Sequence, residues 1–418
     1  MQESPARVAF RYTNFRYYLA VRVLAITSSE MQAVAVAWQV YSLTHRPLDL
    51  GLVGLAQFLP GILLFLVAGH TADRIARQRI LQTCCAGFAL CSLLLLGLTL
   101  HGLSSIVPIY LVLLLNGTVR AFNGPAGQAF VPLLVAQEHF PSAVAWNSSV
   151  FQAATIVGPV LGGLLYGFTA SPATVYICAA VEYFGALVLL AAIRVPTLKR
   201  GPRAAPSGNA LEGLRYIWRS KLILGAISLD LFAVLLGGAV ALLPVYAREI
   251  LKVGASGLGI LRSAPGVGAV IMSLAVAHWP LRRHAGAIML WCVCGFGVFT
   301  VIFGLSRNLA LSLAALALIG ACDTVSVIVR HTLIQLSTPD EMRGRVSAVN
   351  VVFIGASNEV GQFESGITAQ WFGTVLAVVL GGLGSIAIVA IWAWRFPALR
   401  RVSELARPAS TVRRPIAR

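Results

Sequence analysis

Long apolar segments alternate along the chain with shorter polar ones. Each apolar segment is close to the roughly 20 residues that an α-helix needs to cross the hydrocarbon core of a bilayer. Lipid offers the backbone no hydrogen-bond partners, so each spanning segment has to satisfy its own backbone groups as a helix. Unbroken apolar runs such as 93–96 and 375–379 do not fit the alternating strands of a membrane β-barrel.

These segments predict an all-α membrane protein with twelve transmembrane helices. The expected ranges are 17–43, 48–70, 79–100, 107–133, 143–167, 172–193, 222–246, 254–278, 286–306, 309–335, 346–371 and 374–395. One long polar interruption divides the spans into two groups of six. We therefore predict an N-terminal six-helix bundle over residues 1–195, a cytoplasmic linker over 196–221, a C-terminal six-helix bundle over 222–396 and a basic cytoplasmic tail over 397–418.

The two groups of spans also look like repeats of one another. A shift of 203 residues places Gly117 on Gly320 and Asn147 on Asn350. Each match alone is weak, but several matches at one offset without a gap indicate two parallel structural repeats. Transporters built from parallel repeats hold their substrate site between the halves, near the middle of the membrane.

Composition narrows the class of protein further. Hydrophobic residues make up 58% of the chain and charged residues only 11%, whereas soluble domains are nearer a quarter charged. The net charge of +17 would suit nucleic acid, but most Lys and Arg residues fall on one side of the predicted membrane. This bias follows the positive-inside rule and places both termini in the cytoplasm. We expect a multi-pass protein of the bacterial cytoplasmic (inner) membrane that contacts anionic lipid, not nucleic acid.

The polar loop after the second predicted span carries a distinctive set of residues. They are Gly69, Asp73, Arg74, Arg77 and Arg79. Gly permits close approach of helices, and an Asp can cap a helix N-terminus or pair with Arg, so this loop suits a cytoplasmic latch. The alternative is a basic loop that only sets the orientation in the membrane.

Two further motifs lie inside predicted spans. Arg120 in the fourth span is followed by Gly124 four residues later. An Arg at this depth is costly unless it is paired or hydrated, so it serves either transport or a structural tie between helices. The fifth span carries the set Gly158, Pro159, Gly162 and Gly163. Small residues allow close helix packing and Pro bends the helix, so generic packing is the alternative to a functional motif.

Together these motifs resemble those of the major facilitator superfamily of transporters. The loop resembles the superfamily's signature between the second and third helices, Arg120 its intramembrane Arg motif, and the Gly-Pro set its antiporter and exporter motif. The segments 37–44, 50–60, 335–350 and 357–366 are similar to the bacterial branch that contains the enterobactin exporter and many drug-efflux-like proteins. The resemblance covers nearly the whole chain from Asn14 to Trp394. It implies the two-bundle fold and export, but it does not give the cargo.

Ionisable residues inside the predicted spans are the candidates for proton coupling and substrate binding, because each must be paired, hydrated or protonated in lipid. They are Glu30, Asp323, Arg330, Glu359, Asp230, Glu364 and Arg120. Asp323 and Arg330 are seven residues apart, so they share one helix face and can line one cavity. Asp323 also stands at the repeat position of Arg120, which makes an ion pair between the halves an alternative. Structural pairing between helices is the other interpretation of every candidate.

Glu30 lies in the middle of the first span, a helix that lines the cavity in transporters of this superfamily. The expected cavity-wall residues are Gln32, Trp38, Gln39, Gln57 and Arg262. Of these, Gln57 and Arg262 stand at corresponding places in the two repeats. We expect a monomer whose partners are a small-molecule substrate, protons and membrane lipids.

The sequence lacks the sets of residues that the common classes of enzyme need. Nucleophilic catalysis requires a base and an orienting partner beside the nucleophile, and no such set is evident. The seven histidines show no metal-ligand spacing, and no Gly-Lys-Ser/Thr phosphate loop is present. We therefore expect no enzymatic activity, no metal and no cofactor, and we do not expect ATP to drive transport directly.

The leading hypothesis is a proton-coupled exporter of a small amphipathic molecule, such as a siderophore or a drug-like compound, working by alternating access. A carboxyl group that alternates between a desolvated place and one beside an Arg would bind and release the coupling proton. The first alternative is a flippase of lysolipid or lipid with the same fold. The second is a non-transporting membrane receptor, although buried charges of both signs speak against it.

Overall fold

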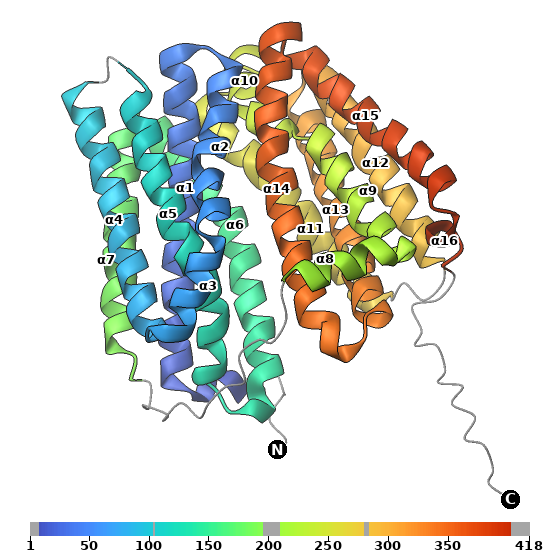
Figure 1. The fold of residues 1–418 in the computed structure, drawn as a ribbon. Coiled ribbons are helices and arrows are strands. Elements are labelled where there is room, and N and C mark those ends of the chain that lie inside the picture. The colour runs from blue at the N-terminus through green and yellow to red at the C-terminus, as the bar shows by residue number, and fades with distance from the viewer. Residues whose placement is uncertain (1–7, 103–104, 195–209, 280–283, 403–418) are drawn as a thin grey trace, which may run out of the picture.

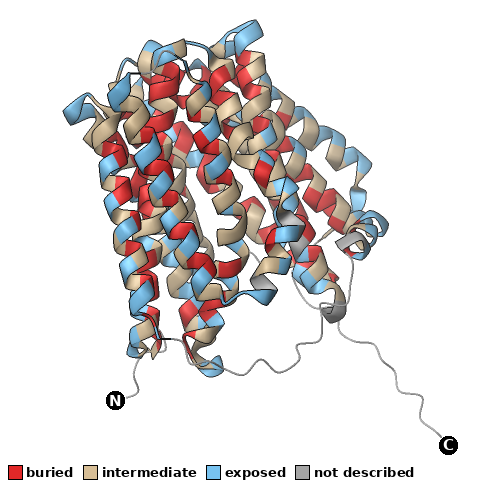
Figure 2. Ribbon diagram, turned by 60° about the vertical axis from the view of Figure 1, so that its left-hand side comes forward, coloured by how far each residue is buried: buried red, intermediate tan, exposed pale blue. Residues whose placement is uncertain are grey.

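The computed structural model describes residues 8–102, 105–194, 210–279 and 284–402. Within these ranges the chain is helical almost throughout, as Figure 1 shows. The fold class predicted from the sequence, an all-α membrane protein, is confirmed. Many large apolar side chains point outward, among them Leu100, Val181 and Trp291. Figure 2 shows exposed positions along the outer faces of the helices and buried ones between them, as expected of a bundle that faces lipid.

The N-terminal half consists of seven α-helices. They are α1 (Thr13–Thr44), α2 (Pro47–Leu63), α3 (Phe65–Arg74), α4 (Arg77–His101), α5 (Val107–Phe130), α6 (Phe140–Thr169) and α7 (Pro172–Ala192). Short 3₁₀ segments at Val8–Arg11, Val131–Leu133 and Gln137–His139 complete this half. The predicted span 48–70 is broken at Leu64, shortly after the helix-interior Pro60. The Leu64 N–H still donates to the Pro60 carbonyl oxygen, 2.9 Å away, so the two pieces follow one another closely.

The C-terminal half repeats this arrangement with one more interruption. Its longer helices are α8 (Ala210–Arg219), α9 (Lys221–Leu236), α11 (Gly254–His278), α12 (Ala285–Leu305), α13 (Leu309–Ser337), α14 (Asp340–Phe372) and α15 (Thr374–Arg395). The short pieces are a 3₁₀ turn at Ala239–Leu242, α10 (Leu243–Val245), a π-turn at Tyr246–Ile250 and α16 (Pro397–Arg400). The predicted span 222–246 is interrupted at Gly237 and Gly238. A Cβ on Gly238 would lie only 2.7 Å from the Gly361 carbonyl oxygen, so α14 packs closely against this break.

The predicted count of twelve spans is reproduced only in part. Across the described ranges, nine helical segments are long and apolar enough to cross a membrane. The predicted spans 48–70, 107–133 and 346–371 correspond to α2–α3, α5 and α14, which are helical but not among those nine. The first is divided into shorter pieces. The helix α5 carries Arg120 and several polar residues, and α14 carries several charged side chains, which lowers the hydropathy of both.

The predicted linker 196–221 contains a helix, because α8 begins at Ala210. This helix lies against α14, where Arg345 forms an ion pair with Glu212. Its Tyr216 hydroxyl donates to the carbonyl of Ser337 at the end of α13, 3.0 Å away. Residues 195–209 lie outside the described residues, as does most of the predicted tail. The part of the linker that the structure describes is therefore a docked element of the C-terminal half.

The two halves lie side by side and meet mainly through two helix pairs, α2 with α14 and α6 with α11. Both contacts are close because Gly residues stand at them. A Cβ on Gly163 would lie 2.7 Å from the Ala255 carbonyl oxygen, and one on Gly51 would lie 3.0 Å from the Phe363 Cα. These residues lie toward the end of the molecule where α1 finishes and α2 starts, which we name the closed end. We name the opposite end, where the chain begins, the open end.

Candidate functional site: a cavity between the halves

A cavity of about 1140 Å³ lies between the two halves, on the side of the open end. It is bounded by the first part of α6, the later parts of α11 and α13, and one residue of α1. Its lining mixes polar and apolar side chains, including Asn147, Ser149, Gln152, Phe151, Val157, Ser273, Leu274, Thr324 and Val327. The cavity is large enough for a drug-sized molecule, and its mixed lining suits a cargo that carries both polar and apolar surface.

Two charged residues reach this cavity from opposite halves. Arg22 of α1 donates a hydrogen bond from its Nε to the Asn147 Oδ1, 3.1 Å away, which holds the guanidinium against α6. Asp323 of α13 lines the cavity from the C-terminal half. The sequence identified Asp323 as a candidate but missed Arg22 as a cavity residue. The signal was present, because an Arg inside a predicted span is costly without water or a partner.

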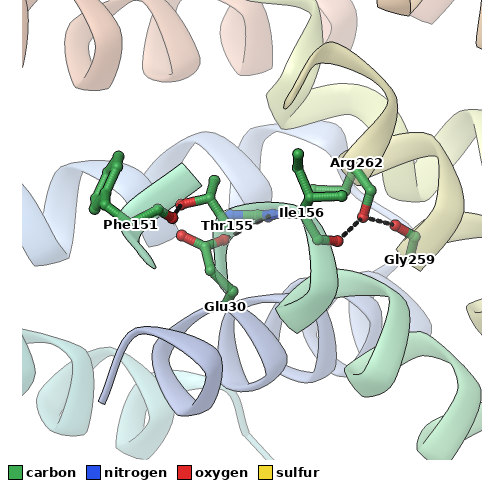
Figure 3. A network of polar contacts seen from close by, with 7 residues as sticks. Glu30, Phe151, Thr155, Ile156, Gly259 and Arg262 are labelled. Carbon is green, nitrogen blue, oxygen red and sulfur yellow. Dashed lines mark hydrogen bonds and ion pairs between the residues drawn. The ribbon is translucent and has the colours of Figure 1, made fainter. Parts of the chain in front are cut away.

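Glu30 and Arg262 form an ion pair between the halves, just beyond the cavity toward the closed end. The Arg262 Nε lies 3.8 Å from the Glu30 Oε2, and both side chains are about a quarter exposed. Figure 3 shows this pair between α1 and α11, beside Thr155 and Ile156 of α6. The Ser263 hydroxyl, next along α11, lies 2.6 Å from the Ile156 carbonyl oxygen. The predicted cavity-wall residue Arg262 is thus placed against the predicted coupling residue Glu30.

Arg120 and Glu359 form a second ion pair of the same kind, from α5 to α14. The Arg120 Nη1 lies 3.9 Å from the Glu359 Oε1, and Glu359 also accepts a hydrogen bond from Gln362, 3.2 Å away. Glu359 interacts electrostatically with Arg262 as well as with Arg120. The four residues of the two pairs therefore form one central charge cluster. Arg120 pairs with Glu359 and not with Asp323, the partner considered from the repeat.

The ion pair of Arg330 and Asp230 differs from these two because it is buried within one half. Their side chains, on α13 and α9 of the C-terminal half, are 1% and 8% exposed and in direct contact. Arg330 is absent from the residues that line the large cavity, so it does not share that cavity with Asp323 as the seven-residue spacing suggested. Glu364 accepts a hydrogen bond from Thr368 on its own helix, 2.7 Å away.

Two of the predicted cavity-wall residues lie inside the N-terminal half instead. Gln32 accepts a hydrogen bond from Ser92 at 2.6 Å. The Gln39 amide accepts from the Tyr176 hydroxyl at 2.6 Å and donates to Thr99 at 3.0 Å. These partners satisfy amides that would otherwise be costly among apolar helices. Both residues thus tie helices of one half together.

The other predicted wall residues lie near contacts between helices. Gln57 is half-buried on α2, and a Cβ on Gly117 of α5 would lie only 2.2 Å from its carbonyl oxygen. Trp38 packs edge-to-face against Tyr166, and the Arg248 guanidinium lies 5.9 Å from its ring centre. Trp38 therefore belongs to the closed end and not to the large cavity.

The closed end is held by polar contacts that the sequence did not indicate. The Tyr41 hydroxyl at the end of α1 donates a hydrogen bond to Glu249, and Arg248 donates to Ser42 at 2.6 Å. These contacts join the N-terminal half to the π-turn after α10. Arg248 and Glu249 fall at the edge of a predicted span, where charged residues are common, so nothing in the sequence distinguished them.

The residues of the predicted antiporter motif all lie at close helix contacts. A Cβ on Gly158 would lie 2.6 Å from the Glu30 Cβ, and one on Gly162 would lie 2.7 Å from the Met31 Cα. Gly163 faces the other half, against α11, and Pro159 approaches Gly259 there. The same helix therefore positions Glu30 on one face and seals the closed end on the other.

The residues of the predicted cytoplasmic latch lie around the turn between α3 and α4 and have different surroundings. Arg77 donates to the Ala129 carbonyl at 3.0 Å, which ties the loop to the end of α5. Gly69 has open space where a Cβ would stand, so the close helix approach expected there is absent in this conformation. Arg74 ends α3 and Arg79 lies in the first turn of α4, and both are exposed. The side chain of Asp73 lies outside the described residues.

Two helical halves around a central cavity, with ion pairs between them, define a transporter of the major facilitator type. The chain belongs to the transmembrane secretion effector family of that superfamily, whose family profile matches residues 5–415. The resemblance stated from the sequence motifs is therefore confirmed.

Curated relatives and solved structures agree with this class. The chain is 29% identical over 384 residues to the enterobactin exporter EntS of Shigella boydii serotype 4, covering 89% of this chain and 85% of the relative. It is equally similar to EntS of Escherichia coli O139:H28. A bacterial homologue of the human lysosomal transporter Spinster, in an inward-facing and unoccupied conformation, has a TM-score of 0.73 at 14% identity, covering 93% and 96% of the two chains. The nucleoside transporter NupG has a TM-score of 0.74 at 12% identity, with coverages of 92% and 99%.

Proposed function

We propose that this protein is a proton-coupled exporter of a small amphipathic molecule, a siderophore or a drug-like compound, that works by alternating access. The main support is the cavity of about 1140 Å³ between the halves, with a mixed lining and a single closed end. The similarity to enterobactin exporters favours a siderophore over other amphipathic cargo. No enzymatic step and no cofactor are needed in this mechanism.

The proposed orientation assigns each end of the molecule to one side of the membrane. The bias of Lys and Arg supports an orientation with both termini in the bacterial cytoplasm, in which the open end faces the cytoplasm and the closed end faces outward. In this state the cavity loads cargo from inside the cell. Release requires the closed end to part while the open end closes, and the short contacts of Gly163 and Gly51 between the halves are the ones that must separate.

Coupling requires a group whose charge changes the balance between the two states. Glu30 and Asp323 are the proposed carriers, because each carboxylate lies at or beside the passage between the halves. Protonation of Glu30 would weaken its attraction to Arg262 and so loosen a contact between the halves. Protonation of Asp323 would remove a charge from the cavity wall. Either change alters the relative free energies of the two conformations.

The first prediction tests this coupling. We expect Glu30→Gln or Asp323→Asn to reduce proton-gradient-driven efflux of enterobactin from cells or proteoliposomes by roughly tenfold or more, corresponding to at least about 1.4 kcal/mol. Protein amount in the membrane is measured in parallel. Unchanged efflux in both variants would reject these two carriers.

The identity of the cargo is tested by ligand-dependent thermal stabilisation of the purified protein. A compound that binds the folded state raises its melting temperature, so enterobactin, ethidium and lysophosphatidylcholine can be compared side by side. Stabilisation by enterobactin or ethidium supports the exporter. Stabilisation by the lysolipid alone, with movement of labelled lysolipid across liposomes, would support a flippase instead.

A further inference from the structure

A second, much smaller cavity lies inside the C-terminal half, directly behind the wall of the large one. Its volume is about 10 Å³, and it touches Asp230 of α9, Asp323 and Ser326 of α13, and the α12 residue Phe296. Asp323 lines both the small cavity and the large one. Its side chain therefore stands between the transport cavity and the buried interior of the half. A volume of this size is about that of one water molecule, provided that polar groups surround it.

Polar groups without partners point to what this cavity holds. Among the residues that the structure describes, the Ser326 Oγ lines this cavity and is buried without a hydrogen-bond partner, and so is the Arg330 Nε, which lies outside the lining. Ser326 and Arg330 lie three and seven residues after Asp323 on α13, so all three share one helix face. Buried polar atoms of this kind are normally satisfied, often by an ordered water. A water in the small cavity would contact Asp323, Ser326 and Asp230.

The charges around the small cavity do not balance. Asp230 and Arg330 neutralise each other in their buried ion pair, which leaves the carboxylate of Asp323 in excess. The small cavity's other lining residues include no cation; the remaining titratable lining group is the Cys322 thiol, with Cys292 of α12 close to it. Across the large cavity, Arg22 of α1 is held by Asn147. Without a partner cation, this carboxylate is stabilised only by water of the large cavity, which it also lines, or by a bound proton.

In the central charge cluster, by contrast, the positive and negative charges are equal in number. Glu30 pairs with Arg262 and Glu359 pairs with Arg120, so two carboxylates already face two guanidinium groups. Adding a proton there would break a neutral arrangement, whereas adding one to Asp323 would create a neutral arrangement. The count of charges therefore favours Asp323 over Glu30, two candidates between which the sequence alone did not decide.

We propose that Asp323 is the group that carries the coupling proton, and that a water in the small cavity links it to the Asp230–Arg330 pair. This inference rests on the proposed proton-coupled function and names the carrier within it. A proton from cytoplasmic or external water adds to a carboxylate oxygen of Asp323 and gives a neutral carboxylic acid. When the halves rock and Asp323 faces water on the other side, the acid returns the proton to that water. The fixed Asp230–Arg330 pair keeps the interior of the half neutral throughout.

The test is infrared difference spectroscopy of the purified, full-length protein during a pH titration. The band of a protonated carboxyl group that grows as the pH falls is expected to be lost in Asp323→Asn. It is expected to remain in the matched controls Glu30→Gln and Glu359→Gln, which neutralise carboxylates of the central cluster. A second variant, Asp323→Glu, keeps a titrating carboxyl at the site and is expected to retain a band, so a folding defect of Asp323→Asn does not decide the result.

Retention of the band in Asp323→Asn, or its loss in Glu30→Gln, would overturn the assignment. A titration that disappears when sodium is present would also overturn it, since a monovalent cation would then be the natural occupant. Because the measurement needs no cargo and no gradient, it is independent of the transport assay. Absence of gradient-driven efflux in the wild-type protein would count against the proposed function without altering the infrared result.

Discussion

At the scale of single residues, the ionisable side chains of this membrane protein occupy two settings with different energetics. Arg330 and Asp230 are almost fully buried and in direct contact, so removal of one partner leaves a charge in a dry interior. Glu30 and Arg262 are partly exposed and 3.8 Å apart, so water can replace either partner. The first setting suits a structural role, and the second suits a contact that must break and reform.

We expect Asp230→Asn to destabilise the protein more than Arg262→Gln. Leaving an unpaired charge in a buried site costs about 3–5 kcal/mol, whereas loss of a partly exposed pair costs about 0–1 kcal/mol. The measurement is the apparent melting temperature of each purified variant relative to wild type. An equal or smaller shift for Asp230→Asn would show that water reaches the Asp230–Arg330 pair.

The sequence predicted which charged residues would lie within the spans, but not which of them would pair. The cost of a charge in lipid is a local property, and it was enough to select Glu30, Asp323, Arg330 and Glu359. Pairing depends on how each helix is rotated and on neighbours remote in sequence, as with Asp230 and Arg330, which are 100 residues apart. For the same reason Gln32 was expected at the cavity but bonds to Ser92 inside one half.

At the scale of helices, glycines at repeat-related positions make equivalent contacts in the two halves. A Cβ on Gly117 of α5 would lie 2.2 Å from the Gln57 carbonyl oxygen of α2, and one on Gly320 of α13 would lie 1.9 Å from the Pro265 carbonyl oxygen of α11. The offset of 203 residues seen in the sequence thus has a physical cause, since both positions require the absence of a side chain. These contacts lie within a half, whereas those of Gly163 and Gly259 lie between halves.

This difference predicts two classes of Gly→Ala variant. Gly320→Ala forces α13 away from α11 inside one half, so we expect a lower melting temperature and less protein, with an overpacking cost of about 1–3 kcal/mol. Gly259→Ala, whose Cβ would lie 2.3 Å from the Pro159 carbonyl oxygen, separates the halves at the closed end. We expect it to expose that end to water while each half stays folded.

The measurement is the melting temperature together with labelling by a membrane-impermeant reagent from the outside. The label is read at a cysteine introduced in place of Ser42, relative to the same variant without that cysteine, because the chain has seven native cysteines. Gly61→Ala serves as the control, because a Cβ there has open space around it. Equal destabilisation by Gly320→Ala and Gly259→Ala, without a change in labelling, would contradict the distinction between the two kinds of contact.

At the scale of the whole molecule, the sequence predicted two halves and a path between them but not the state in which they stand. The two states of such a transporter differ in which end of the interface is closed, and the same residues must suit both. The hydrophobic pattern and the repeats along the chain predict the helices and the two halves, which are the same in both conformations. The state shown here is fixed by contacts such as Tyr41 with Glu249 and Gly163 with α11, which no pattern along the chain marks.

If alternating access operates, preventing the closed end from opening should stop transport. Gly167 of α6 and Ser256 of α11 face each other there, and a Cβ on Gly167 would lie 3.3 Å from the Ser256 Cβ, close to the Cβ separation of roughly 3.5–4.5 Å in disulfides. We expect the double variant Gly167→Cys, Ser256→Cys to form a disulfide under oxidation, to lose efflux, and to recover it on reduction. Each single variant, treated in the same way, controls for the substitutions and for the native cysteines. Efflux that continues in the fully cross-linked protein would mean that cargo crosses without separation of α6 from α11 at this end, and rocking of the two halves would then have to be replaced by a movement within one of them.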